Sequence, residues 1–105
     1  MGGREHDGSG LHGVAGTAHA SRYLQQLCKH WSHKIDVAFD ASAGTIAFDT
    51  GVVATLHASG DALSVDLRGG DEEALRRMTK TLEDHLNRFA FREGPLPFSW
   101  HPSPA

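Results

Sequence analysis

The sequence predicts a two-layer α+β domain in which two helices pack on one face of an antiparallel sheet. Three observations support this fold class. An apolar stripe with helical spacing lies in each half of the chain, four segments between these stripes alternate in hydrophobicity, and short glycine-containing turns separate those segments. Each element then has one apolar surface to bury, so both helices belong on the same side of the sheet. The predicted order is (β)-α-β-β-β-β-α.

The first helix is expected over residues 20–34, after a weakly alternating run at 13–18 that could form a short strand. Its apolar stripe has the i, i+3, i+4, i+7 spacing of a buried face and consists of Leu24, Leu27, Cys28 and Trp31. Beside it runs a second stripe of aromatic, amide and imidazole groups, made of Tyr23, Gln26, His30 and His33. A surface helix usually carries charged residues there, so the second stripe indicates a site.

Four strands are expected in the middle of the chain, over residues 35–40, 45–49, 52–57 and 63–67. Short connections of this kind join antiparallel neighbours, which predicts a four-stranded meander. The face turned away from the helices would carry small and polar residues, namely Asp36, Ala38, Ala47, Thr55, Ser64 and Asp66. Such a face can meet water or a second subunit.

The second helix is expected to begin after Asp71, which is a good N-terminal cap, and to run to about Phe91. Its buried stripe comprises Leu75, Met78, Leu82, Leu86 and Phe89, with His85 beside it. Gly94 and Pro95 then stop the helix, and residues 96–100 continue as an extended tail.

Length and composition indicate one compact domain over residues 13–100, with flexible tails at 1–12 and 101–105. The formal charge of −3 argues against a nucleic-acid-binding protein that neutralises phosphates. No apolar run approaches the ~20 residues of a membrane span. Cys28 is the single cysteine, which excludes an internal disulfide, and the N-terminus lacks the apolar stretch of a secretory signal. We therefore expect a cytoplasmic protein.

A family resemblance rests on three blocks of sequence: ASRYLQQLCKHWSHK, GTIAF and DHLNRFAFREGPLPFSW. Over residues 14–100 the chain resembles the bacterial family catalogued as domain of unknown function 2218. The resemblance implies a small cytoplasmic protein whose relatives are often encoded near siderophore and iron-transport functions. It supplies no catalytic residues. His19 stands where a helix-capping Asp is expected, which leaves the start of the first helix without an evident cap.

The candidate ligand-binding residues are Tyr23, His30, His33, His85, Arg88 and Arg92. If both helices lie on one sheet face, His85 can approach the first helix. The cluster His30, His33 and His85, with Glu93, Asp84 or Cys28, could then bind a metal ion such as iron or zinc. The alternative is that these histidines cap helix ends and fill the seam between the helices, because the sequence has no metal-binding motif of diagnostic spacing.

Arg88 and Arg92 lie one helical turn apart and could clamp the carboxylate of a small anionic ligand or a siderophore-related compound. The alternative is a solvated helix end whose arginines favour the helix dipole. The sequence has no glycine-rich nucleotide loop and no recognisable catalytic triad.

The leading functional hypothesis is a non-catalytic binding or accessory protein, linked to iron or siderophore handling by resemblance alone. One alternative is a small metal-dependent enzyme that uses the histidine cluster. Another is a homodimeric interaction module without a small-molecule site. We expect a monomer or a weak homodimer, or a sheet face covered by the tail Phe98-Ser99-Trp100.

Overall fold

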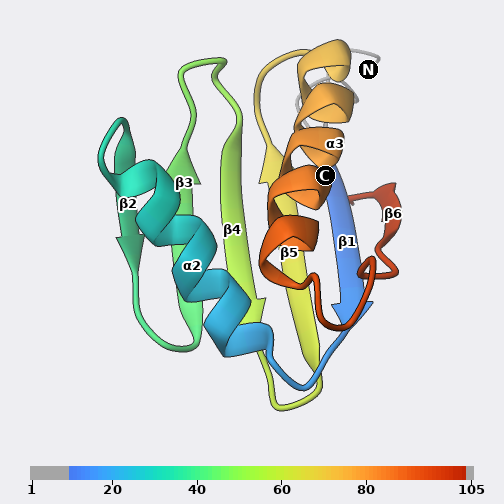
Figure 1. Cartoon of the computed structure of the whole chain (residues 1–105). Helices are drawn as coiled ribbons and strands as arrows, with labels where there is room; N and C mark the ends of the chain where they lie inside the picture. Colours follow the sequence, from blue (N-terminus) through green and yellow to red (C-terminus); the bar gives the residue numbers. More distant parts are fainter. Residues whose placement is uncertain (1–9, 104–105) are drawn as a thin grey trace.

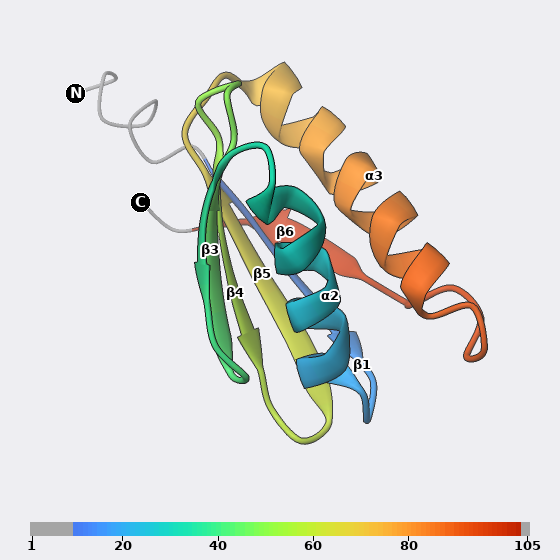
Figure 2. The ribbon, with the colours of Figure 1, turned by 60° about the vertical axis from the view of Figure 1, so that its left-hand side comes forward.

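The computed structural model describes residues 10–103, which form two helices on one face of a six-stranded sheet (Figure 1). The elements are β1 (Gly10–Gly16), α2 (Ala20–Ser32), β2 (Asp36–Phe39), β3 (Ala43–Ala47), β4 (Val53–Ala58), β5 (Ala62–Arg68), α3 (Glu72–Phe89) and β6 (Ser99–Pro102). The strands are antiparallel in the order β2-β3-β4-β5-β1-β6. The predicted α+β sandwich is confirmed, and Figure 2 shows both helices on the same side of the sheet.

The sheet has six strands, so the prediction of four was wrong in number. Strands β2 to β5 form the expected meander, while β1 pairs with β5 and β6 pairs with β1. Gly10 and Pro102 mark the start of β1 and the end of β6, so the sheet extends beyond the predicted domain of 13–100. Residues 1–9 and 104–105 of the predicted tails lie outside the described residues.

Both helices bury the stripes that the sequence predicts. Leu24, Leu27 and Cys28 of α2 are completely buried, as are Leu82 and Leu86 of α3. Trp31 and Phe89 belong to the same stripes but are only partly buried, because they lie at the surface between the helices. Among residues 10–103, no helix is long and apolar enough to cross a membrane.

The two helices start in different ways. The side chain of Asp71 accepts a hydrogen bond of 2.8 Å from the backbone N–H of Ala74, as expected for an N-terminal cap. His19 makes no such bond at the start of α2. Instead, its own backbone N–H donates to the hydroxyl of Thr17 at 3.1 Å, so Thr17 fixes the chain at the entrance to α2.

The segment after α3 returns to the helix-bearing side of the sheet. Trp100 lies opposite Gly13 in the pairing of β1 and β6, and its indole N–H donates to the Glu83 carboxylate of α3 at 2.5 Å. Phe98 stacks on Trp100 with 5.3 Å between ring centroids. One of the three predicted alternatives, in which this tail covers the opposite sheet face, was wrong, because the alternation along β6 turns Trp100 toward α3.

The sheet face opposite the helices carries small and polar side chains. Ala38, Ala47 and Asp36 are exposed there, and Val14 and Val53 are each 39% exposed. Asp66 accepts hydrogen bonds from Arg68 and from the hydroxyl of Ser103, both at 3.0 Å.

Candidate functional site

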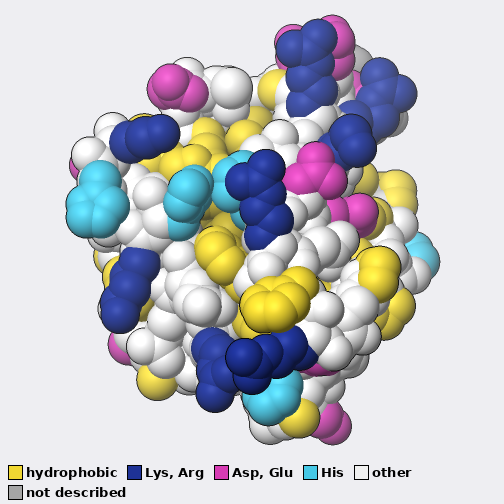
Figure 3. Space-filling model, viewed as in Figure 1, with side chains coloured by type: hydrophobic (Ala, Val, Ile, Leu, Met, Phe, Trp, Pro, Cys, Tyr) yellow, Lys and Arg dark blue, Asp and Glu magenta, His cyan; other side chains and the backbone are white. Residues whose placement is uncertain are grey.

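The helix-bearing face is rich in basic side chains. Seen from this side, Lys, Arg and His side chains surround the seam between α2 and α3 (Figure 3). α2 itself has no acidic residue, although the whole chain has a formal charge of −3. α2 therefore brings positive but no negative side chains to this face, which favours anions near that helix.

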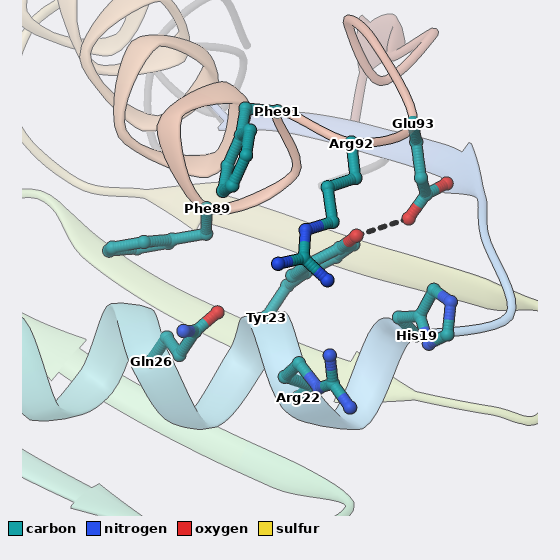
Figure 4. A pocket seen from close by; sticks show the side chains of 8 residues that line it. All are labelled: His19, Arg22, Tyr23, Gln26, Phe89, Phe91, Arg92 and Glu93. Atoms are coloured by element: carbon teal, nitrogen blue, oxygen red, sulfur yellow. Dashed lines mark hydrogen bonds between the residues drawn. The ribbon is translucent and has the colours of Figure 1, made fainter.

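A pocket of about 500 Å³ opens at one end of this seam, between the start of α2 and the C-terminal end of α3 (Figure 4). The residues that line it are His19, Arg22, Tyr23, Gln26, Phe89, Phe91, Arg92 and Glu93. On α2 the polar lining residues Arg22 and Gln26 are four residues apart, which places them one turn apart on one face. The other wall comes from the last turn of α3 and the segment that follows it.

Tyr23 and Glu93 form a polar contact across the pocket (Figure 4). Tyr23 is only 4% exposed, and its hydroxyl donates a hydrogen bond to the Glu93 carboxylate. The hydroxyl of Thr17 reaches the same carboxylate, 2.8 Å from Oε2 and 3.1 Å from Oε1. The bonds from Tyr23 and Thr17 lower the pKa of Glu93, whereas burial and the bond to Glu93 raise the pKa of Tyr23. At neutral pH the site thus holds a protonated phenol and an ionised carboxylate.

Two guanidinium groups lie at the pocket beside an exposed aromatic ring. Within residues 10–103, neither Arg22 nor Arg92 forms an ion pair. Phe91 is 71% exposed, and the guanidinium carbon of Arg92 lies 5.5 Å from the centroid of its ring. The pocket therefore offers positive charge and apolar surface side by side, which is the combination that recognises an organic anion.

His30 and His85 meet farther along the same seam, outside the pocket. Their ring centroids are 4.9 Å apart, and the ring of Trp31 lies 4.7 Å from that of His85. Nδ1 of His85 is 2.8 Å from the carbonyl oxygen of Thr81. Because a carbonyl oxygen only accepts, Nδ1 carries a proton and Nε2 remains available to a ligand.

The structure does not bring together the three-histidine metal centre that the sequence predicts. Among the described residues, no group of three or more His, Cys, Asp or Glu side chains could hold a metal ion. His33 follows the last residue of α2 and is exposed. Cys28 is buried in the core, where burial raises its pKa to about 11, and Glu93 is bonded to Tyr23.

The predicted ligand-binding residues thus divide between two places. Tyr23 and Arg92 line the pocket, whereas His30 and His85 form a separate pair, and Arg88 is near enough to act electrostatically on His30. Four pocket residues belong neither to the second stripe nor to the predicted ligand or metal sites: His19, Arg22, Phe89 and Phe91. A usable signal was present, because Arg22 lies one helical turn before Gln26 of the second stripe.

Comparison with known proteins gives a family. The sequence profile of domain of unknown function 2218, described as an uncharacterized protein conserved in bacteria, matches residues 12–101. The chain belongs to this family. One relative is PA4090 from Pseudomonas aeruginosa, whose NMR structure has a TM-score of 0.77 and 32% sequence identity, over 92% of this chain and 99% of that chain. The match confirms the predicted resemblance. No curated protein matches the chain.

Proposed function

We propose that this member of the family binds a small organic anion that carries an aromatic or other apolar ring. The observation behind this proposal is the pair of guanidinium groups, Arg22 and Arg92, beside the exposed ring of Phe91 in one pocket. Arginine can bind a carboxylate through two parallel hydrogen bonds, which fixes the orientation of a planar ligand. The ring of the ligand would then lie against Phe91.

Glu93 restricts which anions fit. Its carboxylate is held by Tyr23 and Thr17, so it stays on one side of the pocket and remains a hydrogen-bond acceptor. An anion that also carries a hydroxyl or amine donor would satisfy Glu93, whereas a second negative charge there would be repelled. A siderophore-related hydroxybenzoate belongs to this class of ligand, which connects the pocket with the iron association that the family resemblance implies.

The same contact supports binding rather than proton transfer. The raised pKa of Tyr23 keeps its hydroxyl protonated at neutral pH, and the lowered pKa of Glu93 makes its carboxylate a weak base. Neither group is therefore tuned as a general base near pH 7. Binding requires only that the Tyr23 hydroxyl and the Glu93 carboxylate keep fixed positions.

The experiment is an NMR titration of the full chain with 2-hydroxybenzoate, benzoate, acetate and benzyl alcohol. We expect the two aromatic carboxylates to shift amide signals of residues 19–26 and 89–93, with 2-hydroxybenzoate binding more tightly than benzoate. Acetate lacks the ring and benzyl alcohol lacks the charge, so both should bind more weakly. Arg22→Gln and Arg92→Gln should each weaken binding about tenfold, the loss that corresponds to one charge-assisted hydrogen bond of about 1.4 kcal/mol.

Arg76→Gln is the matched control, because Arg76 is exposed in the first half of α3 and does not line the pocket. This variant should bind both aromatic carboxylates with unchanged affinity. If Arg22→Gln and Arg92→Gln bind as well as Arg76→Gln, or if the shifted signals lie elsewhere, the proposal is wrong.

A further inference from the structure

The His30–His85 pair lies outside the proposed pocket and is surrounded by positively charged side chains. Burial lowers the pKa of His30, and the positive charges of His85, Lys34, Arg88 and His33 lower it further. These groups come from both helices and from the turn after α2. Within residues 10–103, no acidic group is among those that shift the pKa of His30.

The carboxylates on the neighbouring helix have other partners. Asp84 precedes His85 in α3, but its carboxylate lies 3.9 Å from the ammonium group of Lys80. Glu83 accepts the hydrogen bond from the indole of Trp100. From the sheet side, the residue packed against this cluster is Phe48, whose uncharged ring contacts Trp31 at 4.9 Å.

We propose that His30 and His85, with Arg88 and Lys34, form a second site that binds a tetrahedral oxyanion such as sulfate or a phosphate group and takes up protons as it does so. Among the described residues, neither the ring nitrogens of His30 nor Nε2 of His85 has a hydrogen-bond partner, and Nδ1 of His85 is bonded to the carbonyl oxygen of Thr81. Once protonated, each imidazole offers an N–H donor to a shared oxyanion.

Proton uptake follows from the sign of the neighbouring charges. In the free protein the surrounding cations disfavour the protonated form of His30. A bound dianion reverses that sign, favours protonation of both imidazoles and therefore raises their pKa values. By linkage, the anion must bind more tightly as the pH falls through the histidine range. A metal cation would instead lower the pKa values of the two imidazoles. It would also be repelled by Arg88 and Lys34, with no carboxylate in the cluster to offset their positive charge.

The test is a pH titration of the histidine ring signals by NMR, between pH 5 and 8.5, in sodium sulfate and in sodium chloride at equal ionic strength. Sulfate is the probe because it does not itself titrate in this range. We expect sulfate to raise the pKa values of His30 and His85 by about half a unit or more, equivalent to about a threefold change in affinity between the two protonation states. His57 is an internal reference, because it is exposed on β4 and belongs to the opposite face of the sheet.

Two variants assign the effect to the cluster. Arg88→Gln should reduce the sulfate-induced shift at His30, whereas Arg76→Gln, farther along α3, should leave it unchanged. The proposal fails if His30 and His85 respond to sulfate no more than His57 does. It also fails if Zn²⁺ lowers both pKa values while sulfate leaves them unchanged, since that result would assign a metal site. None of these outcomes depends on the pocket at Arg22 and Arg92.

Discussion

The hydroxyl of Tyr23 in α2 donates a hydrogen bond to the carboxylate of Glu93, 70 residues later in the chain. Thr17, in the segment before α2, donates to the same carboxylate at 2.8 Å. Three separate segments therefore meet at one acceptor group. This contact holds the turn after α3 against α2, and the walls of the pocket depend on it.

Tyr23→Phe should remove this link while keeping the aromatic ring in place. We expect the free energy of unfolding to fall by about 1 kcal/mol, the usual net value of one hydrogen bond. The pKa of Glu93 should rise toward its ordinary range, because the carboxylate loses the hydrogen bond that lowers this pKa most. Urea denaturation measures the first effect and NMR titration of the Glu93 carboxyl measures the second. An unchanged Glu93 pKa would mean that the bond does not exist in solution.

Gly13→Ala tests the close packing of β1 and β6. A Cβ atom at residue 13 would lie 2.5 Å from the indole ring of Trp100, which Glu83 also holds through a hydrogen bond. The ring must move, so we expect a loss of about 1–3 kcal/mol in the free energy of unfolding, measured by urea denaturation. Gly60→Ala is the control, because a Cβ atom there meets nothing within 4 Å. Equal losses in the two variants would contradict the packing described.

The sequence predicted the meander and both helices because their signals are local. In β5, for example, Leu63, Val65 and Leu67 alternate with exposed or half-buried residues, and all three are completely buried. The two outer strands lack such a signal: β1 was indicated only by the weak alternation at 13–18, and β6 was expected as an extended tail. β1 has glycine at positions 10, 13 and 16, and β6 ends in Pro102, so their pairing depends on partners from opposite ends of the chain.

The pocket was only partly predicted for a related reason. Tyr23 on α2 and Arg92 just beyond α3 could be recognised from their own segments, but nothing local indicates that Arg22 and Phe91 line the same pocket. That arrangement depends on how α2 and α3 cross the sheet. The same crossing explains why His85 meets His30 as expected while His33, beyond the end of α2, contributes only its charge.

Cys28 should be nearly inert in the folded protein. Its side chain is completely buried, and burial raises the pKa of the thiol to about 11. A shift of two units from the ordinary value of 9.0 lowers the thiolate fraction about a hundredfold at pH 8. We therefore expect a thiol reagent such as dithionitrobenzoate to react with the native protein at least about a hundredfold more slowly than with protein unfolded in urea. Similar rates in the two states would show that the core around Cys28 is open.

Acid should destabilise the fold in two separate pH ranges. The pKa of His30 is lower in the folded protein than in the unfolded chain. As the pH falls below about 6.5, His30 therefore takes up a proton first in the unfolded chain, and the free energy of unfolding decreases until the pH passes the pKa of His30 in the folded protein. The pKa of Glu93 is also lowered, so this carboxylate stabilises the fold above its ordinary value of 4.5, and the stabilisation is lost as the pH falls through its pKa in the folded protein.

Urea denaturation as a function of pH separates the two ranges. His30→Gln should flatten the stability profile near pH 6 and leave its slope below pH 4.5 unchanged. Glu93→Gln should do the reverse, because a neutral amide cannot contribute a titration in the acid range. Some slope below pH 4.5 should survive in Glu93→Gln, since the bonds from Ser42 and Ala43 also lower the pKa of Asp40. If Glu93→Gln keeps the whole acid slope of the unmodified chain, Glu93 is not held by Tyr23 and Thr17 in solution.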